Sequence, residues 1–207
     1  MQNKVGFFIV LGLWLMAMQF ADAEESGWYG GFAVGQGDLK TKLSDWDDST
    51  LLSGDIAKDN PAYKVYAGYR ITPRYWIETG YLDFADVTMT GQSSGGYLWN
   101  KGAVAGSIHV LGLNVSGVAA QPIAAYGAFF VKAGIFFWDS TMIQNPTILG
   151  EFKNNDDGID FSFGAGAEFR IYQKWKLRGE WEHVGVTFAS VQESSATLAS
   201  LGLLWDF

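Results

Sequence analysis

The sequence predicts an all-β protein, an eight-stranded antiparallel up-and-down transmembrane β-barrel, and three observations carry this prediction. Hydrophobic and polar residues alternate with a period of two along much of the chain, as expected of strands with one apolar face. The alternating segments number eight, which is even. The connections between them alternate in length, which is typical of outer-membrane barrels that have short turns at one end and long loops at the other.

The clearest alternation lies in two neighbouring segments. In FSFGAGAEFRI, residues 161–171, aromatic and aliphatic residues take the odd positions, while Glu168 and Arg170 lie among the even ones. In WKLRGEWEH, residues 175–183, Trp175 and Trp181 share the face opposite the charged residues. The two segments predict a hairpin that turns at YQK.

Charge predicts the register of this hairpin. Pairing Glu168 with Arg178 opposes unlike charges and leaves glycines opposite Glu180 and Glu182. A slip of two residues would instead put Glu168 beside Glu180, and Arg170 beside Arg178. Because like charges directly opposite each other destabilise a sheet, we expect the first register.

Six further segments complete the predicted barrel. They lie at residues 28–36, 62–71, 75–84, 107–116, 128–138 and 196–207. Short links follow the second, fourth and sixth strands, at TPR, GVAAQPIA and YQK. The links after the first, third and fifth strands span about 37–61, 85–106 and 139–158, and the last link, about 184–194, is intermediate. This asymmetry predicts that both termini of the barrel domain lie on the periplasmic side.

The N-terminal segment, residues 1–23, is predicted to be a signal peptide. Lys4 provides a short positive start, VGFFIVLGLWLMAM is apolar, and Ala21 and Ala23 occupy the positions that a signal peptidase reads. Cleavage is expected before Glu24, which leaves residues 24–207 as one barrel domain. An uncleaved membrane anchor is the alternative, but the apolar run is short for a spanning helix of about 20 residues.

Composition excludes several functional classes. The formal charge is −8 and no basic stripe is present, which argues against nucleic-acid binding. Without cysteine, the chain has neither a disulfide framework nor a thiolate metal site, and we expect no cofactor. The segment DWDDSTLLSGD suggests a calcium loop, but Thr50 stands at the sixth place, where such a loop needs glycine. We therefore expect a solvated acidic loop and no metal site.

The alternation fits a soluble periplasmic ligand-binding barrel as well as a membrane barrel, and the two differ in which face points outward. In a membrane barrel the apolar face meets lipid and the charged face fills the lumen. The leader, the unequal connections and the aromatic residues near the short turns favour the membrane barrel. These aromatic residues are predicted to form an interfacial girdle: Tyr69, Tyr75, Tyr172, Trp175, Trp205 and Phe207.

The lumen is then expected to hold a mixed network of charges, since an unpaired ion away from water costs on the order of several kcal/mol. Its predicted members are Lys64, Arg70, Glu78, Lys132, Glu168, Arg170, Lys176, Arg178, Glu180 and Glu182. Because eight strands leave an interior filled by side chains, we expect no open pore.

The last strand carries a resemblance to a known family. Phe207, preceded at alternate positions by Trp205, Leu203 and Leu201, resembles the terminal signal that the barrel-assembly machinery reads in bacterial outer-membrane proteins. The segments VKAGIFFW, FSFGAGAEFRI and KLRGEWEH are similar to strands of the small OmpA-like and OmpX-like barrels, and the similarity covers essentially all of residues 24–207. It implies export through the inner membrane, contact with periplasmic chaperones, a location in the outer membrane of a Gram-negative bacterium, and a structural, adhesive or surface role.

The resemblance also implies that the lumen network blocks or gates the barrel. Glu78, Glu168 and Arg178 match the family pattern by strand. Asn114 stands where the fourth strand of the family carries a basic residue, and Lys132 on the fifth strand is the candidate substitute. A second departure is that full-length OmpA proteins continue into a peptidoglycan-binding domain, whereas this chain ends on the last strand, so peptidoglycan binding is not carried over.

Two enzymatic interpretations are weaker. Paired lumen glutamates could perform acid and base chemistry, but a filled barrel gives a substrate no access. Lipid A deacylases are barrels of similar length in which a lipid-facing His works with a Ser two positions later. Here Leu111 follows His109, and Gly185 follows His183, at that spacing. The nucleophile that a hydrolytic dyad requires is missing, so we expect no enzymatic activity.

The function expected from the sequence is a structural or adhesin-like surface-interaction role through the extracellular loops. The expected partners are outer-membrane lipid and lipopolysaccharide, with which acidic loops could share divalent cations, and an external surface ligand. A lipid-modifying outer-membrane enzyme and a small-solute channel are the alternatives.

Overall fold

The computed structural model describes residues 27–41, 46, 49–57, 60–96, 99–123, 127–147, 150–187 and 194–207, and the predicted leader lies outside them. The strands are β1 (Gly27–Leu39), β2 (Leu51–Ile56), β3 (Asn60–Thr72), β4 (Tyr75–Ser93), β5 (Gly102–Ile123), β6 (Gly127–Thr147), β7 (Gly150–Tyr172), β8 (Trp175–Val186) and β9 (Ser194–Asp206). Within these ranges no helix is long and apolar enough to span a membrane.

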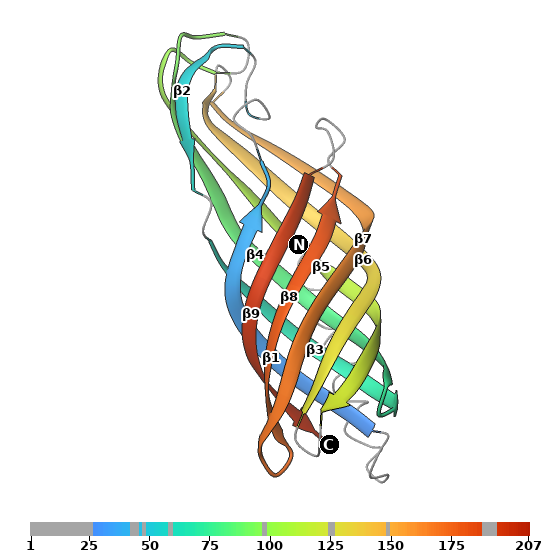
Figure 1. Cartoon of the computed structure of the whole chain (residues 1–207). Helices are drawn as coiled ribbons and strands as arrows, with labels where there is room; N and C mark the ends of the chain where they lie inside the picture. Colours follow the sequence, from blue (N-terminus) through green and yellow to red (C-terminus); the bar gives the residue numbers. More distant parts are fainter. Residues whose placement is uncertain are drawn as a thin grey trace.

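Eight of these strands close into a ring. The order is β1, β3, β4, β5, β6, β7, β8 and β9, each antiparallel to its neighbours, and β9 returns to β1 by pairing Ala196–Asp206 with Tyr29–Leu39. Figure 1 shows the strongly tilted strands around a narrow, elongated barrel. The predicted eight-stranded, up-and-down barrel is therefore confirmed.

The ninth strand, β2, lies on the same side of β4 as β3 does, farther along β4. β3 pairs with β4 as far as Phe84, and β2 pairs with β4 from Met89 to Ser93. The outer part of β4 thus keeps a neighbour on this side after β3 has ended. Sequence alternation did not indicate β2, because its residues, LLSGDI, do not alternate between apolar and polar.

The barrel has two unlike ends. At the turn end, β3 and β4 are joined at residues 73–74, β7 and β8 are joined at residues 173–174, and β9 ends. At the turn after β3, the hydroxyl of Thr72 accepts hydrogen bonds from the backbone N–H groups of Arg74 (3.2 Å) and Tyr75 (3.1 Å). The turn after β7 holds Gln173 at a φ of 42°. The opposite end is called the loop end below.

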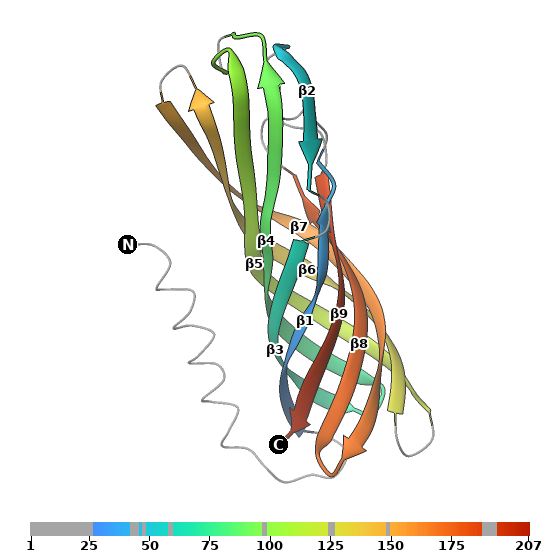
Figure 2. The same ribbon diagram turned by 90° about the vertical axis from the view of Figure 1, so that its left-hand side faces the viewer.

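Long loops were predicted at 85–106 and 139–158, and this prediction is wrong for most of both segments. β4 continues to Ser93, β5 begins at Gly102, β6 continues to Thr147 and β7 begins at Gly150. Figure 2 shows these extensions, together with β2, rising beyond the ends of β1, β8 and β9. We call them the loop-end sheet. Their ladder hydrogen bonds continue. On β4 and β5 one face of the extension is still buried, as at Met89 and Val104, whereas the extension of β7 is open to water on both faces.

The predicted link GVAAQPIA is also mostly strand, since β5 runs to Ile123. Pro122 pairs with Ala128 at the last turn-end positions of this ladder. Proline is tolerated there because a strand end does not need every ladder N–H.

The predicted hairpin register is confirmed. Glu168 pairs with Arg178, Gly166 with Glu180, and Gly164 with Glu182. The glycines leave space for the long glutamate side chains on the inward face: a Cβ at Gly164 would lie 3.2 Å from the Glu182 side chain.

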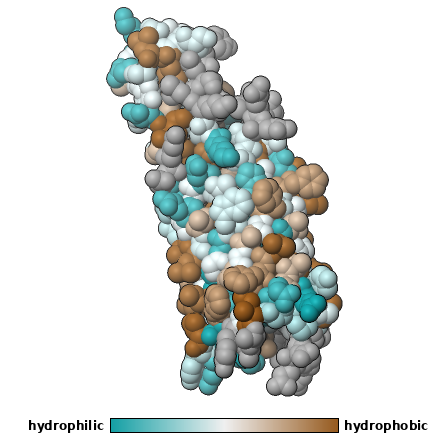
Figure 3. All heavy atoms as spheres, viewed as in Figure 1, coloured by the Kyte–Doolittle hydropathy of each residue, from teal (hydrophilic) through white to brown (hydrophobic). Residues whose placement is uncertain are grey.

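The outward face of the barrel is apolar. Large hydrophobic side chains that are more than one-third exposed include Phe32, Val34, Val65, Ile77, Val115, Phe129, Val131, Ile135, Phe161, Phe163, Leu177, Trp181 and Leu201. On the face in Figure 3, the hydrophobic side chains are concentrated on the lower half of the barrel. A continuous belt of this kind is suited to lipid rather than to water.

Candidate functional site

The centre of the lumen holds a six-membered ionic network. Three cations and three carboxylates project inward from β3, β4, β6 and β8, because each takes an inward position in the alternation of its strand. They are Lys64, Glu78, Lys132, Arg178, Glu180 and Glu182, with exposed fractions between 1% and 7%. Equal numbers of opposite charges allow every ion to be paired, which buried ions require.

Lys64 connects opposite parts of the barrel wall. Its Nζ lies 2.7 Å from Glu182 Oε2, 2.9 Å from Glu180 Oε2 and 3.4 Å from Glu78 Oε1. Lys132, on β6, pairs with the same three glutamates, and its Nζ lies 3.5 Å from Glu78 Oε1. The two lysines therefore share one group of carboxylates.

Arg178 completes the network on its turn-end side. Its Nη1 donates to Glu78 Oε2 at 2.6 Å, and its Nε lies 3.2 Å from Glu180 Oε2. Tyr29 donates from its hydroxyl to the same Glu78 oxygen at 2.7 Å. The guanidinium carbon of Arg178 lies 4.1 Å from the ring centroid of Phe130, a distance at which a desolvated cation is attracted to the ring face.

A second ionic layer lies nearer the turn end. It contains two cations and two carboxylates: Arg70, Glu168, Lys176 and Asp206. Glu168 Oε1 lies 2.9 Å from Arg70 Nη2 and 3.1 Å from Lys176 Nζ, and Lys176 Nζ lies 3.0 Å from Asp206 Oδ2. Arg70 also pairs with Asp206.

Arg170 departs from the expected lumen set. Its side chain is exposed, and none of the ion pairs found among the described residues includes it. Arg170 lies two positions from the end of β7, where water reaches both faces of the strand. It is therefore exposed although it occupies an inward position in the alternation of β7. Asp206, which is not among the expected lumen residues, takes part in its place.

The structure brings Lys132 to the place that the resemblance left open. Asn114 is buried and bridges neighbouring polar groups: its amide donates to Glu182 Oε1 at 3.4 Å, and Ser162 donates to its carbonyl oxygen at 2.7 Å. Lys132 supplies the positive charge from the adjacent strand. The sequence analysis missed Tyr29 and Ser162. Both occupy inward positions in the alternation of β1 and β7, and this pattern could have identified them.

The loop-end half of the lumen is apolar, which corrects the expectation of a polar interior throughout. The buried cluster there contains Leu39, Trp46, Ala62, Leu82, Phe84, Val87, Met89, Trp99, Val104, Ile108, Val110, Phe136, Trp138, Val184, Val186, Ala196 and Leu198. Trp46 and Trp99 are fully buried in it, and Trp99 donates from Nε1 to the backbone oxygen of Trp46 at 2.8 Å. Both faces of these strands are therefore apolar over part of their length.

The two histidines lie on the outward face. His109 Nε2 is 2.9 Å from Asp83 Oδ1, and His109 Nδ1 is 3.1 Å from Asp86 Oδ1. Asp83 faces outward in the alternation of β4, and the bulge between Phe84 and Val87 brings Asp86 to the same side. His183 packs against aromatic rings, with 4.8 Å between its ring centroid and that of Phe163. Among the described residues, no group of three or more acidic, His or Cys side chains is arranged to hold a metal ion.

Aromatic residues gather at the turn end. Tyr69, Tyr75, Tyr172 and Trp175 are 36%, 61%, 64% and 38% exposed. Trp28, which the sequence analysis did not single out, has its ring centroid 5.1 Å from that of Tyr69.

The last strand places its alternate residues on the outer surface. Leu201 is 56% exposed, and Leu203, Trp205 and Phe207 are partly exposed. The rings of Trp175 and Trp205 meet edge to face at 4.9 Å. The backbone N–H of Phe207 donates to the oxygen of Trp28 at 2.9 Å, which joins the end of the last strand to the first.

The family model for the OmpA-like transmembrane domain matches residues 23–207. No curated protein sequence is similar enough to match.

Solved structures of small outer-membrane barrels are similar to the chain in fold. Neisserial surface protein A is 11% identical, with 89% of this chain and 100% of that chain covered and a TM-score of 0.59. Ail, the attachment invasion locus protein of Yersinia pestis, is 11% identical, with 89% of this chain and 100% of that chain covered and a TM-score of 0.54. OprG of Pseudomonas aeruginosa is 10% identical, with 88% of this chain and 96% of that chain covered and a TM-score of 0.51.

Proposed function

Because this chain belongs to the OmpA-like transmembrane domain family and is an outer-membrane β-barrel, we propose that it acts as a non-enzymatic surface-interaction protein. In this proposal the barrel is a rigid anchor, and the loop end faces the cell exterior, as family barrels place their longer connections. The single observation that carries it is the continuation of β4–β7, with β2, as an ordered sheet beyond the apolar belt.

Shortening the β6–β7 hairpin tests this role. Replacing residues 140–156 by a two-residue turn removes loop-end sheet, but it leaves the ladder from the pair of Asp139 and Asp157 to the turn end. We expect the variant to reach the outer membrane while adherence of the expressing cells to cultured epithelial cells falls. Unchanged adherence at equal surface amount would contradict the proposal.

A packed interior supports an anchor rather than a small-solute channel. The two ionic layers and the loop-end apolar cluster follow one another along the barrel axis, and Trp46 and Trp99 lie within the cluster. Planar-bilayer recordings of purified protein are expected to show no large, stable single-channel steps. Such steps would favour the channel alternative.

The outward histidines support a role without hydrolysis. Both ring nitrogens of His109 lie next to carboxylates, so neither is directed at a nucleophile, which a catalytic base requires. Incubation with lipopolysaccharide followed by mass spectrometry should show unchanged acyl chains. Loss of an acyl chain would favour the lipid-modifying alternative.

Three further contacts belong to the proposal. Leu201, Leu203, Trp205 and Phe207 would be read by the barrel-assembly machinery after delivery by periplasmic chaperones, and the outward apolar face would contact lipid and lipopolysaccharide. The exposure of Leu201 and the outward position of its neighbours support recognition from the lipid side. Replacing Trp205 and Phe207 together by Ala is expected to slow insertion into membranes that contain the purified machinery.

A further inference from the structure

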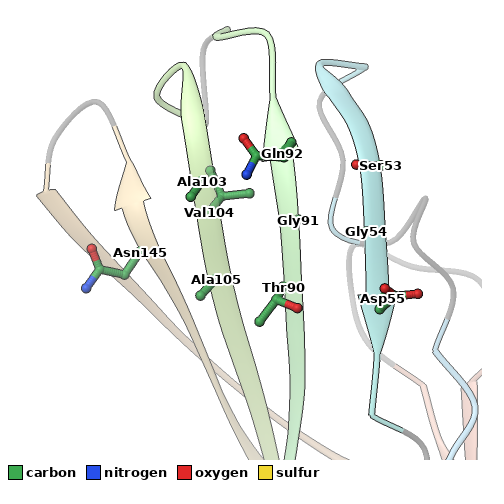
Figure 4. A pocket seen from close by; sticks show the side chains of 10 residues that line it. All are labelled: Ser53, Gly54, Asp55, Thr90, Gly91, Gln92, Ala103, Val104, Ala105 and Asn145. Carbon is green, nitrogen blue, oxygen red and sulfur yellow. The ribbon is translucent and has the colours of Figure 1, made fainter.

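The loop-end sheet carries a hollow of about 590 Å³ on one face. Figure 4 shows its lining side chains, which come from four adjacent strands, β2, β4, β5 and β6. The hollow is broad and shallow, because it spans the face of a sheet rather than the inside of the barrel. We call it the trough.

Strand register arranges the trough in two rows across the sheet. In each row, a polar residue of β2 pairs with a polar residue of β4, which pairs in turn with an alanine of β5. One row is Asp55, Thr90 and Ala105, with Asn145 of β6 next in line, and the other is Ser53, Gln92 and Ala103. The alanines form a low floor, and the longer polar side chains stand on both sides of it.

The trough lies on the outward face of the sheet. Ala103 and Ala105 share the side of β5 that carries exposed Val115, whereas Val104 between them is buried in the loop-end apolar cluster. Asn145 shares the side of β6 that carries Ile135 and Phe137, which are both 43% exposed. The trough therefore continues the lipid-facing surface of the barrel toward the loop end.

The side chains of the trough favour an uncharged ligand that is rich in hydroxyl groups. Two hydroxyls, two amides and one carboxylate line it, and its lining contains no Lys, Arg or His. Amide groups both donate hydrogen bonds to hydroxyl groups and accept hydrogen bonds from them, and a carboxylate accepts them. A phosphate or sulfate would face Asp55 without a cation to balance its charge. The alanine floor allows the apolar face of a sugar ring to approach.

We propose that the trough binds the sugar chain of a neighbouring lipopolysaccharide molecule through its neutral core sugars rather than through its phosphate groups. The occupant follows from position: if the loop end faces outward, the layer next to the outward face just beyond the lipid is the saccharide layer of the outer leaflet. This inference rests on the proposed orientation of the barrel.

Cysteine labelling tests the trough, because the chain contains no cysteine of its own. Ala105→Cys places a single thiol on the floor. The purified variant is reconstituted into vesicles that contain lipopolysaccharide with a complete core or deep-rough lipopolysaccharide without core sugars, and its reaction with a small maleimide is timed. We expect labelling to be several-fold slower with the complete core.

Glu151→Cys is the matched control. Glu151 is exposed and lies on β7, which pairs with β6, the strand of Asn145. It lies outside the trough. Its labelling rate is expected to be nearly the same in both kinds of vesicle. Equal slowing at both positions would indicate general shielding by the saccharide layer and would overturn the inference. No slowing at Ala105→Cys, or equal slowing with deep-rough lipopolysaccharide, would also overturn it.

A second variant separates hydrogen bonding from simple crowding. Adding Gln92→Ala and Asn145→Ala to Ala105→Cys removes both amides without adding bulk, and should return labelling with the complete core toward the deep-rough rate. Retained slowing would contradict binding by these side chains. Orientation is checked separately by treating intact cells that carry Glu151→Cys with a membrane-impermeant maleimide. If Glu151→Cys is labelled on intact cells but Ala105→Cys shows no slowing in vesicles, sugar binding in the trough is overturned and the proposed orientation stands.

Discussion

Lys64 and Glu182 lie 118 positions apart in the chain, yet Lys64 Nζ donates to Glu182 Oε2 at 2.7 Å across the centre of the barrel. Both side chains are 1% exposed. The contact joins β3 to β8, which are separated by β1 and β9 in the ring. It therefore braces the closed cross-section, in addition to the backbone ladders.

Removing Lys64 should destabilise the barrel strongly. Lys64→Met leaves three carboxylates facing two cations in the central network, and loss of one partner of a buried ion pair costs about 3–5 kcal/mol. We expect a decrease of this size in the free energy of unfolding, measured by urea titration in lipid vesicles.

Two controls accompany this measurement. Lys153→Met, at an exposed position of β7, should change the unfolding free energy by less than about 0.5 kcal/mol. Adding Glu182→Gln to Lys64→Met should recover part of the loss, because the charges balance again. A double variant no more stable than the single one would contradict charge pairing as the cause.

The loop-end apolar cluster should contribute comparably to stability. Trp99→Ala removes a fully buried ring and its hydrogen bond to Trp46, and such truncations cost about 3–5 kcal/mol. Trp99→Phe keeps most of the packing and should lose about 1 kcal/mol, which is typical of one hydrogen bond. Leu52→Ala, at a position that is 72% exposed, is the control and should be nearly neutral in the same urea titration.

Gly106 should not tolerate a side chain. A Cβ there would lie too close to the ring of Trp46, so Gly106→Ala is expected to displace this ring and to cost about 1–3 kcal/mol through overpacking. Gly117→Ala is the matched control on the same strand, because no atom lies within 4 Å of its added Cβ. The free energies of unfolding of the two variants should differ clearly. Equal losses would mean that Trp46 does not pack on Gly106.

Asp160 should secure the loop end of β8. Its carboxylate accepts hydrogen bonds from Trp138 Nε1 (2.8 Å), Thr187 N (2.9 Å) and Thr187 Oγ1 (3.0 Å). Asp160→Ala leaves these donors without their acceptor, so amide hydrogen exchange at Val186 and Thr187 is expected to accelerate. Exchange at Leu177, near the other end of β8, should stay unchanged.

Asp157→Ala is the control for charge at the same part of β7. Asp157 lies directly opposite Asp139, and both are exposed. Opposed like charges destabilise a sheet by a few tenths of a kcal/mol up to about 1 kcal/mol, so this variant should be neutral or slightly stabilised. Faster exchange at Val186 and Thr187 in Asp157→Ala, like that expected for Asp160→Ala, would assign the effect to charge in general rather than to the Thr187 contacts.

The sequence by itself determined the barrel, the inward and outward faces, and one ladder in detail. Period-two alternation identifies a strand face wherever one side meets lipid and the other does not, as in residues 161–171. The pairing of Glu168 with Arg178 followed from charge, because strand neighbours are local and few registers compete.

Only the tertiary structure decided which groups meet across the lumen and where the strands end. The contact of Lys64 with Glu182, the use of Asp206 instead of Arg170, and the inclusion of Trp46 and Trp99 in the apolar cluster depend on ring closure, stagger and tilt, which no local pattern encodes. The loop-end sheet was missed for a related reason. Along residues 150–158 of β7, hydrogen bonding between backbones continues the strand while water reaches both faces, so no alternation marks it. On β4 and β5 the buried face packs against Trp46 and Trp99, which come from other parts of the chain.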